Sequence, residues 1–281
     1  MSAMAYSSAS THPQIFDRDA LNMRRNRHSA SALFLHELAR DEIEDRVSMV
    51  NRKFTKPAIV APFADVWEGV FPGGKITRDD EVLDLAPKAH DLIVHAMSLH
   101  CANDPVGQLI QCRNALEEDG FFLVATLGGR TLHELRTSLA EAETYVTGGI
   151  SPRVSPMGEI RDMGALLQRA GFALPVADVV PMNVEYNTLN HLMHDLRAMG
   201  ETNVLKDRLR TPTKKAVFDL AEHIYKQNFT ANSGRLAATF ELIMLTGWSP
   251  SDSMPKPLRP GSAKMRLSDA LKVPEVKLPK D

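Results

Sequence analysis

The chain has 281 residues, of which 43% are hydrophobic and 24% are charged, and its formal net charge at pH 7 is −2. This composition is sufficient for a buried core in one large domain or two small ones. The near-neutral charge gives no electrostatic reason to expect nucleic acid or an anionic membrane as the main partner. No apolar run approaches the roughly 20 residues that cross a bilayer, and the N-terminus lacks the basic-then-apolar pattern of a secretory signal.

The cysteine content indicates a reducing compartment. Cys101 and Cys112 are the only cysteines, and their separation matches neither a zinc knuckle nor a redox pair. We therefore expect two free thiols and a cytoplasmic protein.

The N-terminal part begins with a flexible polar leader, residues 1–14, which precedes a domain expected to span residues 15–252. An amphipathic helix is predicted near residues 31–50, because apolar residues recur there at helical spacing, namely Leu35, Leu38, Ile43, Val47 and Val50. The preceding basic run, from Arg24 to His28, could hold an anionic substrate, but a solvated charge run is the favoured interpretation.

The middle third alternates strand-like and helix-like segments. Residues 57–63, 91–99 and 120–127 form apolar runs typical of buried strands, and residues 105–116 have helical periodicity. This βαβ alternation predicts a parallel sheet with helices on its faces, so the expected fold class is α/β.

A pair of glycines follows the last of these strand-like runs. Gly128 and Gly129 allow a sharp turn into a helix, at whose start Thr131 and Glu134 fit a capping box. The pair could bring backbone amides close to a ligand at the helix N-terminus, or it could serve only to turn the chain. A full dinucleotide fingerprint would need three spaced glycines.

The last third is predicted to continue the alternation. Ser155 and Pro156 suit the cap and first residue of a helix that ends at Gly171. The segments expected after it are strand-like runs at 173–180 and 182–186, helices near 189–199 and 217–225, a strand at 239–248, and a Pro/Lys-rich tail at 253–281.

Two stretches of sequence carry a family resemblance. Residues 91–136, "DLIVHAMSLHCANDPVGQLIQCRNALEEDGFFLVATLGGRTLHELR", resemble the second half of a class I S-adenosylmethionine-dependent methyltransferase domain. The segments "GGISPRVSPMGEIRDMGALLQRAGF", "HDLRAMGETN" and "GWSP…KPLRPGSAK" are similar to the mitochondrial complex I assembly factors with arginine hydroxylase activity and their bacterial relatives. The malonyl-carrier-protein methyltransferases of biotin synthesis are a more distant resemblance.

This resemblance, which covers the chain from about Phe16 to Lys264, implies a Rossmann-like class I methyltransferase fold with C-terminal α/β additions. It also implies S-adenosylmethionine as a cofactor, a protein partner such as a respiratory-chain subunit, and the mitochondrial matrix as the location in a eukaryote. Neither nucleic acid nor a membrane span is expected.

The region that would hold the cofactor departs from the family pattern. The first strand should be followed by a glycine-rich loop, yet Pro62, Phe63 and Trp67 crowd this turn and no glycine occurs before Gly69. The N-terminal half is also shortened, because too few residues separate Phe63 from the next strand for the usual helix, strand and helix. We therefore predict a degenerate site with weak or absent S-adenosylmethionine binding.

An acidic cluster follows this turn and could replace the carboxylate that normally binds the cofactor's ribose. The candidates are Asp79, Asp80 and Glu81. A solvated acidic turn is the favoured interpretation of these residues.

The carboxyl edge of the sheet supplies the candidate site residues. Ser98, Leu99 and His100 end a predicted strand at the edge where ligands bind in open α/β folds. By resemblance, this edge contacts the cofactor or the substrate. His100 is the candidate catalytic base there, with a structural hydrogen bond as the alternative interpretation, and Ser98, Leu99, Gly128 and Gly129 are the candidate cofactor contacts.

A metal site is not predicted from the sequence. His191, His194 and Asp195 offer the ligand types of a non-haem iron centre, but Asp195 points aside from the shared face of the two histidines. An ordinary, partly exposed helix face is favoured.

Two functional hypotheses follow. The chain is either an enzyme, which is an S-adenosylmethionine-dependent methyltransferase or a protein arginine hydroxylase, or a pseudoenzyme whose fold binds a partner protein as an assembly factor. The missing glycine loop favours the second hypothesis for methyl transfer.

Overall fold

The computed structural model describes residues 13–254 and 265–272. The chain divides into two units, Met1–Pro250 and Ser251–Asp281. In the second unit the described residues contain a short helix, α8 (Leu267–Leu271). Residues 1–12 of the predicted leader and most of the predicted tail lie outside the described residues.

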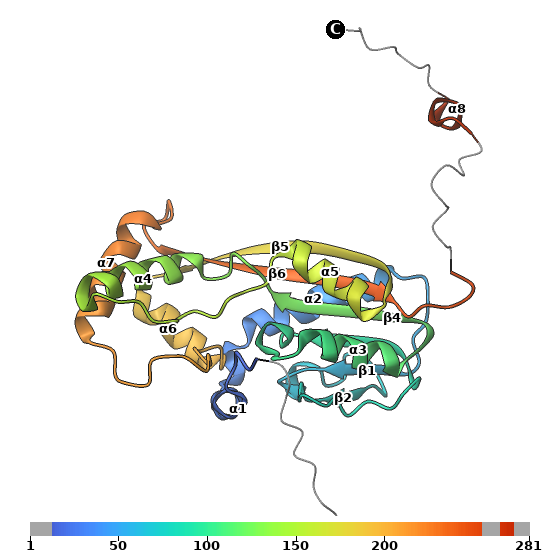
Figure 1. Ribbon diagram of the computed structural model, residues 1–281, viewed down its shortest axis with the longest axis horizontal. Helices are drawn as coiled ribbons and strands as arrows, with labels where there is room; N and C mark the ends of the chain where they lie inside the picture. The colour runs from blue at the N-terminus through green and yellow to red at the C-terminus, as the bar shows by residue number, and fades with distance from the viewer. Residues whose placement is uncertain (1–12, 255–264, 273–281) are drawn as a thin grey trace, which may run out of the picture. The chain divides into compact units, whose positions relative to one another are not determined.

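The first unit is built on a six-stranded sheet with the order β2-β1-β3-β4-β6-β5 (Figure 1). The strands are β1 (Pro57–Val60), β2 (Lys75–Thr77), β3 (His90–Ala96), β4 (Leu116–Leu127), β5 (Ala173–Tyr186) and β6 (Leu236–Trp248). This order, with its helical crossovers, is the Rossmann-like α/β fold expected from the sequence.

The sheet is mixed, whereas the sequence predicted a parallel one. β1, β2, β3 and β4 run parallel, but β6 pairs antiparallel with β4 and β5 pairs antiparallel with β6. The two strand-like runs predicted at 173–180 and 182–186 form the single strand β5. Pro181 interrupted the sequence pattern, and it is tolerated because β5 is an edge strand, where a missing amide hydrogen breaks no ladder in the interior of the sheet.

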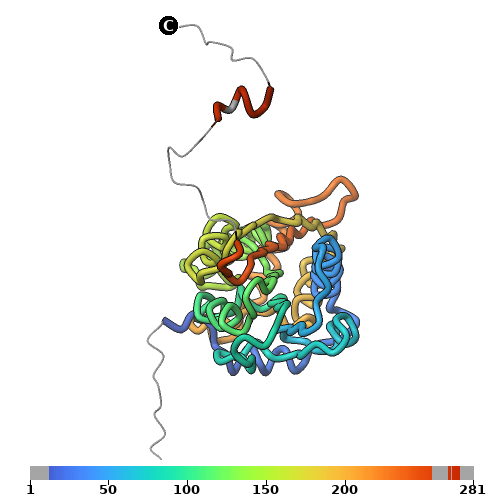
Figure 2. The backbone as a smooth tube through the Cα atoms, turned by 90° about the vertical axis from the view of Figure 1, so that its right-hand side faces the viewer, coloured from blue at the N-terminus to red at the C-terminus, as the bar shows by residue number. Residues whose placement is uncertain are grey.

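Helices cover both faces of the sheet, because the strands are apolar on both. In β4, Phe122 and Val124 point into a core that includes residues of α3 and α5, while Phe121 and Leu123 point into the larger core on the opposite side. Figure 2 shows α2 across the sheet from α3 and α5. The helices are α1 (Arg18–Arg25), α2 (Phe34–Met49), α3 (Pro105–Ala115), α4 (His133–Thr147), α5 (Ile160–Ala170), α6 (Leu189–Ala198) and α7 (Lys215–Asn228).

The N-terminal half of the fold is shortened, as the sequence predicted. All residues between Phe63 and the start of β3 at His90 are described, and they contain only a 3-10 turn, η2 (Ala64–Val66), and the three-residue strand β2. The chain therefore passes from β1 to β2 without an α-helix.

The predicted capping box at the start of α4 is wrong. The helix begins at His133, and Leu132 occupies the cap position with a positive φ of 55°. Thr131 instead exchanges hydrogen bonds with the backbone of Glu241, and Glu134 accepts hydrogen bonds from Thr239. Both side chains therefore form hydrogen bonds with β6 and do not cap the N-terminus of α4.

The predicted start of α5 is also wrong, while its end is confirmed. The helix begins at Ile160 after Glu159, and Gly171 ends it with φ of 84°. Ser155 and Pro156 lie in the preceding loop, where the carbonyl of Ser155 accepts a hydrogen bond from Arg136.

Candidate functional site

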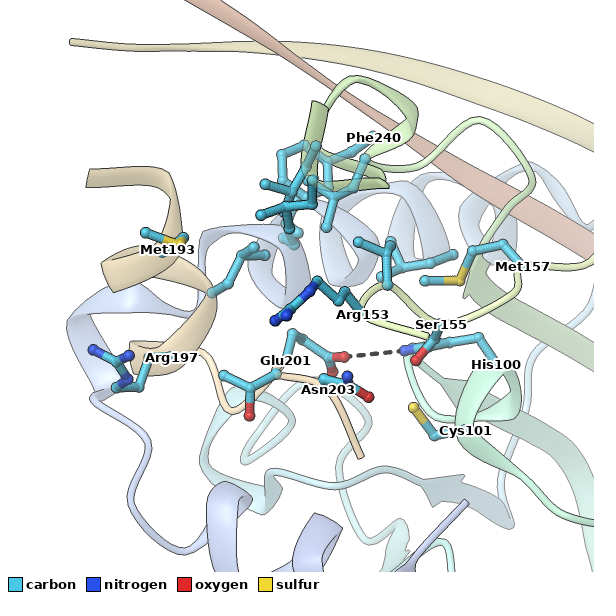
Figure 3. A pocket seen from close by; sticks show the side chains of 18 of the residues that line it. His100, Cys101, Arg153, Ser155, Met157, Met193, Arg197, Glu201, Asn203 and Phe240 are labelled. Atoms are coloured by element: carbon cyan, nitrogen blue, oxygen red, sulfur yellow. Dashed lines mark hydrogen bonds and ion pairs between the residues drawn. The ribbon is translucent and has the colours of Figure 1, made fainter. Parts of the chain in front are cut away.

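A cavity of about 210 Å³ lies near the carboxyl ends of β3 and β4 (Figure 3). Its floor is mainly apolar, and its polar side chains come from segments that are distant in sequence. The lining includes Leu35, His100, Cys101, Leu127, Leu135, Arg153, Ser155, Met157, Met193, Arg197, Glu201, Asn203 and Phe240.

His100 occupies a short 3-10 turn, η3 (Leu99–Cys101), directly after β3. Its ring is held from two sides: Nδ1 lies 3.3 Å from the hydroxyl of Thr126, and Nε2 lies 3.3 Å from Oε2 of Glu201. The Thr126 hydroxyl also accepts a hydrogen bond of 3.1 Å from the backbone amide of His100. The imidazole therefore has a fixed position in the cavity wall.

The protonation states of His100 and Glu201 are set by the attraction of neighbouring charges rather than by burial. Burial alone would lower the pKa of His100, but the neighbouring Cys101 and Glu201 raise it to about 10. Burial alone would raise the pKa of Glu201, but His100, Arg25 and His36 lower it to about 2. With no further ligand, the pair is an imidazolium and a carboxylate at neutral pH.

The loop that precedes α5 forms another wall of the cavity and is tied to α4. Arg153 makes a bidentate ion pair with Glu143 at 2.6 and 2.9 Å, and the hydroxyl and amide of Ser151 donate to the same carboxylate. Arg153 is the largest influence on the pKa of Glu143, which falls to about 2. This network holds Arg153 beside Glu201 (Figure 3).

A buried ion pair lies at the neighbouring end of β2. Asp79 accepts hydrogen bonds of 2.9 and 2.8 Å from Arg25 of α1, and Arg18 approaches the same carboxylate at 3.3 Å. Arg25 and Asp79 are both buried. The predicted solvated acidic turn is therefore wrong for Asp79, although Asp80 and Glu81 are exposed, and the predicted solvated basic run is wrong for Arg25.

Aromatic side chains fill the turn after β1. The ring of Phe63 contacts the rings of His28 and His36, with centroid separations of 4.4 and 4.8 Å. Phe63 and Trp67 are buried. Burial lowers the pKa of His36 to about 3, so this imidazole is neutral.

A second cavity of about 440 Å³ lies beside this turn at the ends of β1 and β2. Its charged lining is Arg25 and Arg78 against the single acid Asp65, and the ring of His28 lies in the same wall. Asp79 does not line it. The lining thus combines basic and aromatic side chains, contains no glycine, and has Asp65 as its one carboxylate.

Of the strand-end residues predicted for the site, His100 faces the first cavity. Ser98 is buried with its hydroxyl 3.5 Å from Nδ1 of His95, and Leu99 packs into the core that includes residues of α3. Neither Ser98 nor Leu99 lines the cavity.

The two glycines lie near the cavity but do not line it. A side chain at Gly128 would meet Ile243 of β6 at 2.6 Å, and one at Gly129 would meet the carboxylate of Glu159. The pair therefore permits close packing of the β4–α4 connection against β6 and the loop before α5.

The other histidine candidates lie elsewhere. His191 and His194 are exposed on α6. Among the described residues, the group of side chains with metal-ligand geometry is His100, Cys101 and Glu201, which sequence reasoning did not assemble. Glu201 belongs to the segment "HDLRAMGETN", which was noted only as a resemblance.

The comparisons with known proteins agree with the sequence resemblance. The mitochondrial arginine-hydroxylase NDUFAF5 of Danio rerio is 36% identical over 202 residues, which are 72% of this chain and 63% of that protein. The human protein is 34% identical over 206 residues, 73% of this chain and 59% of its own length. The chain is a homologue of these arginine hydroxylases. It spans less than two thirds of their length.

A methyltransferase is a more distant homologue. The malonyl-[acyl-carrier protein] O-methyltransferase of Laribacter hongkongensis is 33% identical over 178 residues, 63% of this chain and 57% of the enzyme. Among solved structures, a putative methyltransferase of Bacillus halodurans has a TM-score of 0.48 at 12% identity, covering 75% of this chain and 98% of that one. No protein-family model matches the chain. The chain is thus similar in sequence both to the arginine hydroxylases and to a methyltransferase.

Within the described part of the chain, no helix has both the length and the apolar character needed to cross a bilayer.

Proposed function

We propose that this methyltransferase-like protein does not use S-adenosylmethionine and acts by binding a protein partner, as an assembly factor of the respiratory complex I type. The observation that carries the proposal is the turn after β1. Phe63 contacts His28 and His36 there, in the position where a methyltransferase needs a backbone without side chains to approach its cofactor.

The surrounding charges support the same proposal. The carboxylate after β2 that could bind ribose hydroxyls is engaged by Arg25 and Arg18. The adjoining cavity presents Arg25 and Arg78, which repel the positive sulfonium of the cofactor. The residues present therefore do not fit the cofactor, and no methyl-transfer step is assigned to them.

The first cavity is the proposed contact for the partner. It has an apolar floor and convergent polar groups, which is the usual character of a site that accepts one side chain or small group. The homologous arginine hydroxylases are mitochondrial by name, and we place this chain in the mitochondrial matrix if its source is a eukaryote and in the cytoplasm otherwise. A respiratory-chain subunit is the proposed partner.

Site-specific photo-crosslinking tests the partner site. A photoreactive residue at Met193, which lines the cavity on α6, should crosslink to a subunit of respiratory complex I when the two are mixed. The same residue at Ile110, which is exposed on α3 of the first unit, should not. Equal crosslinking at the two positions, or none at Met193, would contradict the proposal.

Arginine hydroxylation is a second candidate function, and one observation favours it. Oε1 of Glu201 is buried and has no hydrogen-bond partner, so it can accept the guanidinium of a partner's arginine in the cavity. Incubation with an arginine-containing peptide of the crosslinked subunit, under O2 and with a two-electron reductant, should then add one oxygen atom to the peptide by mass spectrometry while the second oxygen atom leaves as water, and Glu201→Gln should abolish the gain. An unchanged peptide mass with the wild-type chain would contradict hydroxylation, and partner binding would remain the proposed function.

A further inference from the structure

We propose that His100, Cys101 and Glu201 bind a divalent metal ion of the zinc type in the wall of the cavity. The three residues bring together one nitrogen, one sulfur and one oxygen ligand whose atoms all lie within 4.8 Å of one another. Nothing in the proposed function requires this ion, and the proposal does not depend on the partner.

The distance between the nitrogen and oxygen ligands matches that between two ligands of one metal ion. Nε2 of His100 and Oε2 of Glu201 are 3.3 Å apart. A charge-assisted hydrogen bond between such groups is typically shorter, about 2.7 to 2.9 Å. Two ligands of a tetrahedral zinc ion with arms of about 2.0 to 2.1 Å are separated by about 3.3 Å.

The surroundings of His100 provide the orientation that metal-bound histidines usually have. When Nδ1 carries the proton, it donates to the hydroxyl of Thr126 at 3.3 Å, and the lone pair of Nε2 faces the carboxylate of Glu201. In this tautomer two acceptors face each other, and a metal ion takes the place of the proton that the unliganded pair shares. A carbonyl, carboxylate or hydroxyl on the far nitrogen is the common outer partner of a metal-bound imidazole.

The third ligand distinguishes a metal from a simple ion pair. A proton joins only His100 and Glu201, whereas a metal ion also takes up the thiolate of Cys101, whose side chain otherwise packs in the small core beside Leu21 and Val204. Figure 3 shows the sulfur of Cys101 on the side of its residue that faces Glu201 and His100. Because all three residues line the cavity, the fourth coordination position is open to water or to an incoming side chain, as in catalytic rather than structural zinc sites.

The mixed donor set also restricts the metal. A thiolate and an imidazole favour zinc and similar ions over magnesium or calcium, which prefer oxygen ligands. Cobalt(II) is therefore a suitable spectroscopic probe, because it replaces zinc and reports thiolate ligation through a charge-transfer band.

The test is a titration of the chelator-treated chain with Co²⁺, followed by Zn²⁺. The wild type should develop d–d absorption and a thiolate-to-cobalt band at one equivalent, and Zn²⁺ should remove both. Cys101→Ser should lose the charge-transfer band, and Glu201→Gln, which removes a direct ligand, should bind the ion more than about 100-fold more weakly, a loss beyond the 10- to 100-fold typical of an outer-shell partner. Cys112→Ser is the matched control, because Cys112 is also buried but lies in the core on the other face of the sheet.

Several results would overturn the proposal. A wild-type spectrum equal to that of free Co²⁺, or a charge-transfer band that disappears in Cys112→Ser and persists in Cys101→Ser, would do so. If Cys101→Ser does not fold, X-ray absorption of the zinc-loaded wild type decides instead. A sulfur neighbour at about 2.3 Å supports the site, and a shell of nitrogen and oxygen alone contradicts it. Because the isolated chain is used, a negative result leaves the proposed partner binding unaffected.

Discussion

At the scale of single residues, the pair of Arg25 and Asp79 shows how a charge cluster can be read wrongly from sequence. Both residues lie in charged runs that resemble solvated surface, yet the packing of α1 against the end of β2 buries them together. Arg25 and Arg18 keep the pKa of Asp79 low in spite of burial, which acts to raise it. The pair therefore stays ionised and joins α1 to the sheet.

Removing one partner of this pair should be costly. In Asp79→Asn, the buried guanidinium of Arg25 loses its compensating charge, and the free energy of unfolding should fall by about 3 to 5 kcal/mol. Urea denaturation followed by circular dichroism measures the loss. Asp80→Asn is the neighbouring control, because that side chain is exposed, and it should change stability by less than about 0.5 kcal/mol. Equal effects of the two substitutions would show that the buried pair does not stabilise the fold.

The carboxylate of Glu143 gives a pH-dependent prediction. Its pKa is about 2 in the folded chain against an ordinary value of 4.5, so its contribution is present above pH 4.5 and is lost as the pH falls toward 2. Glu143→Gln should lower the free energy of unfolding at pH 7 by about 2 kcal/mol.

The difference between Glu143→Gln and wild type should shrink below pH 4.5, as measured by chemical denaturation at a series of pH values. Glu141→Gln is the control, because Glu141 is exposed on the same helix. A difference that stays constant down to pH 2 would mean that the Glu143–Arg153 pair does not hold the loop over the cavity.

At the scale of elements, the connection between β4 and α4 explains the glycine pair. Gly128 forms an isolated bridge with Gly158, and its amide donates to the carbonyl of Glu241 at 2.8 Å. Neither Gly128 nor Gly129 has a positive φ. The need for glycine is therefore steric, and it differs between the two positions.

Alanine substitutions should separate these two steric requirements. In Gly128→Ala the new methyl group would meet buried Ile243 at 2.6 Å, and overpacking of this kind costs about 1 to 3 kcal/mol. In Gly129→Ala the methyl group would meet the movable carboxylate of exposed Glu159, so the cost should be below about 0.5 kcal/mol. Thermal unfolding of the two variants measures both losses of stability. A larger loss for Gly129→Ala would contradict the packing role assigned to Gly128.

At the scale of the whole molecule, the apolar patterns of the sequence predicted the fold well. The buried runs around β1, β3 and β4 are apolar on both faces and could hardly be anything other than central strands. The direction of β6 and the continuity of β5 through Pro181 were not predictable from these patterns, because they depend on which strand each one meets.

The site was predictable only in part, for a similar reason. His100 was identifiable because it follows a strand at the carboxyl edge of the sheet. Glu201 follows α6 and reaches His100 only through the packing of α6 and its loop, a hundred residues further along the chain. Cys101 becomes a candidate ligand only when His100 and Glu201 lie beside it. Periodicity and local motifs could therefore not indicate the three-residue cluster.

We propose that the chain's own side chains occupy the edge of the fold that holds S-adenosylmethionine in methyltransferases. Calorimetric titration of the purified chain with S-adenosylmethionine, and separately with its demethylated product, tests this claim most directly. We predict no binding heat at millimolar ligand for either compound, because Phe63 fills the turn and Asp79 is paired with Arg25. A micromolar dissociation constant would contradict the account and would identify the chain as an active S-adenosylmethionine-dependent methyltransferase candidate.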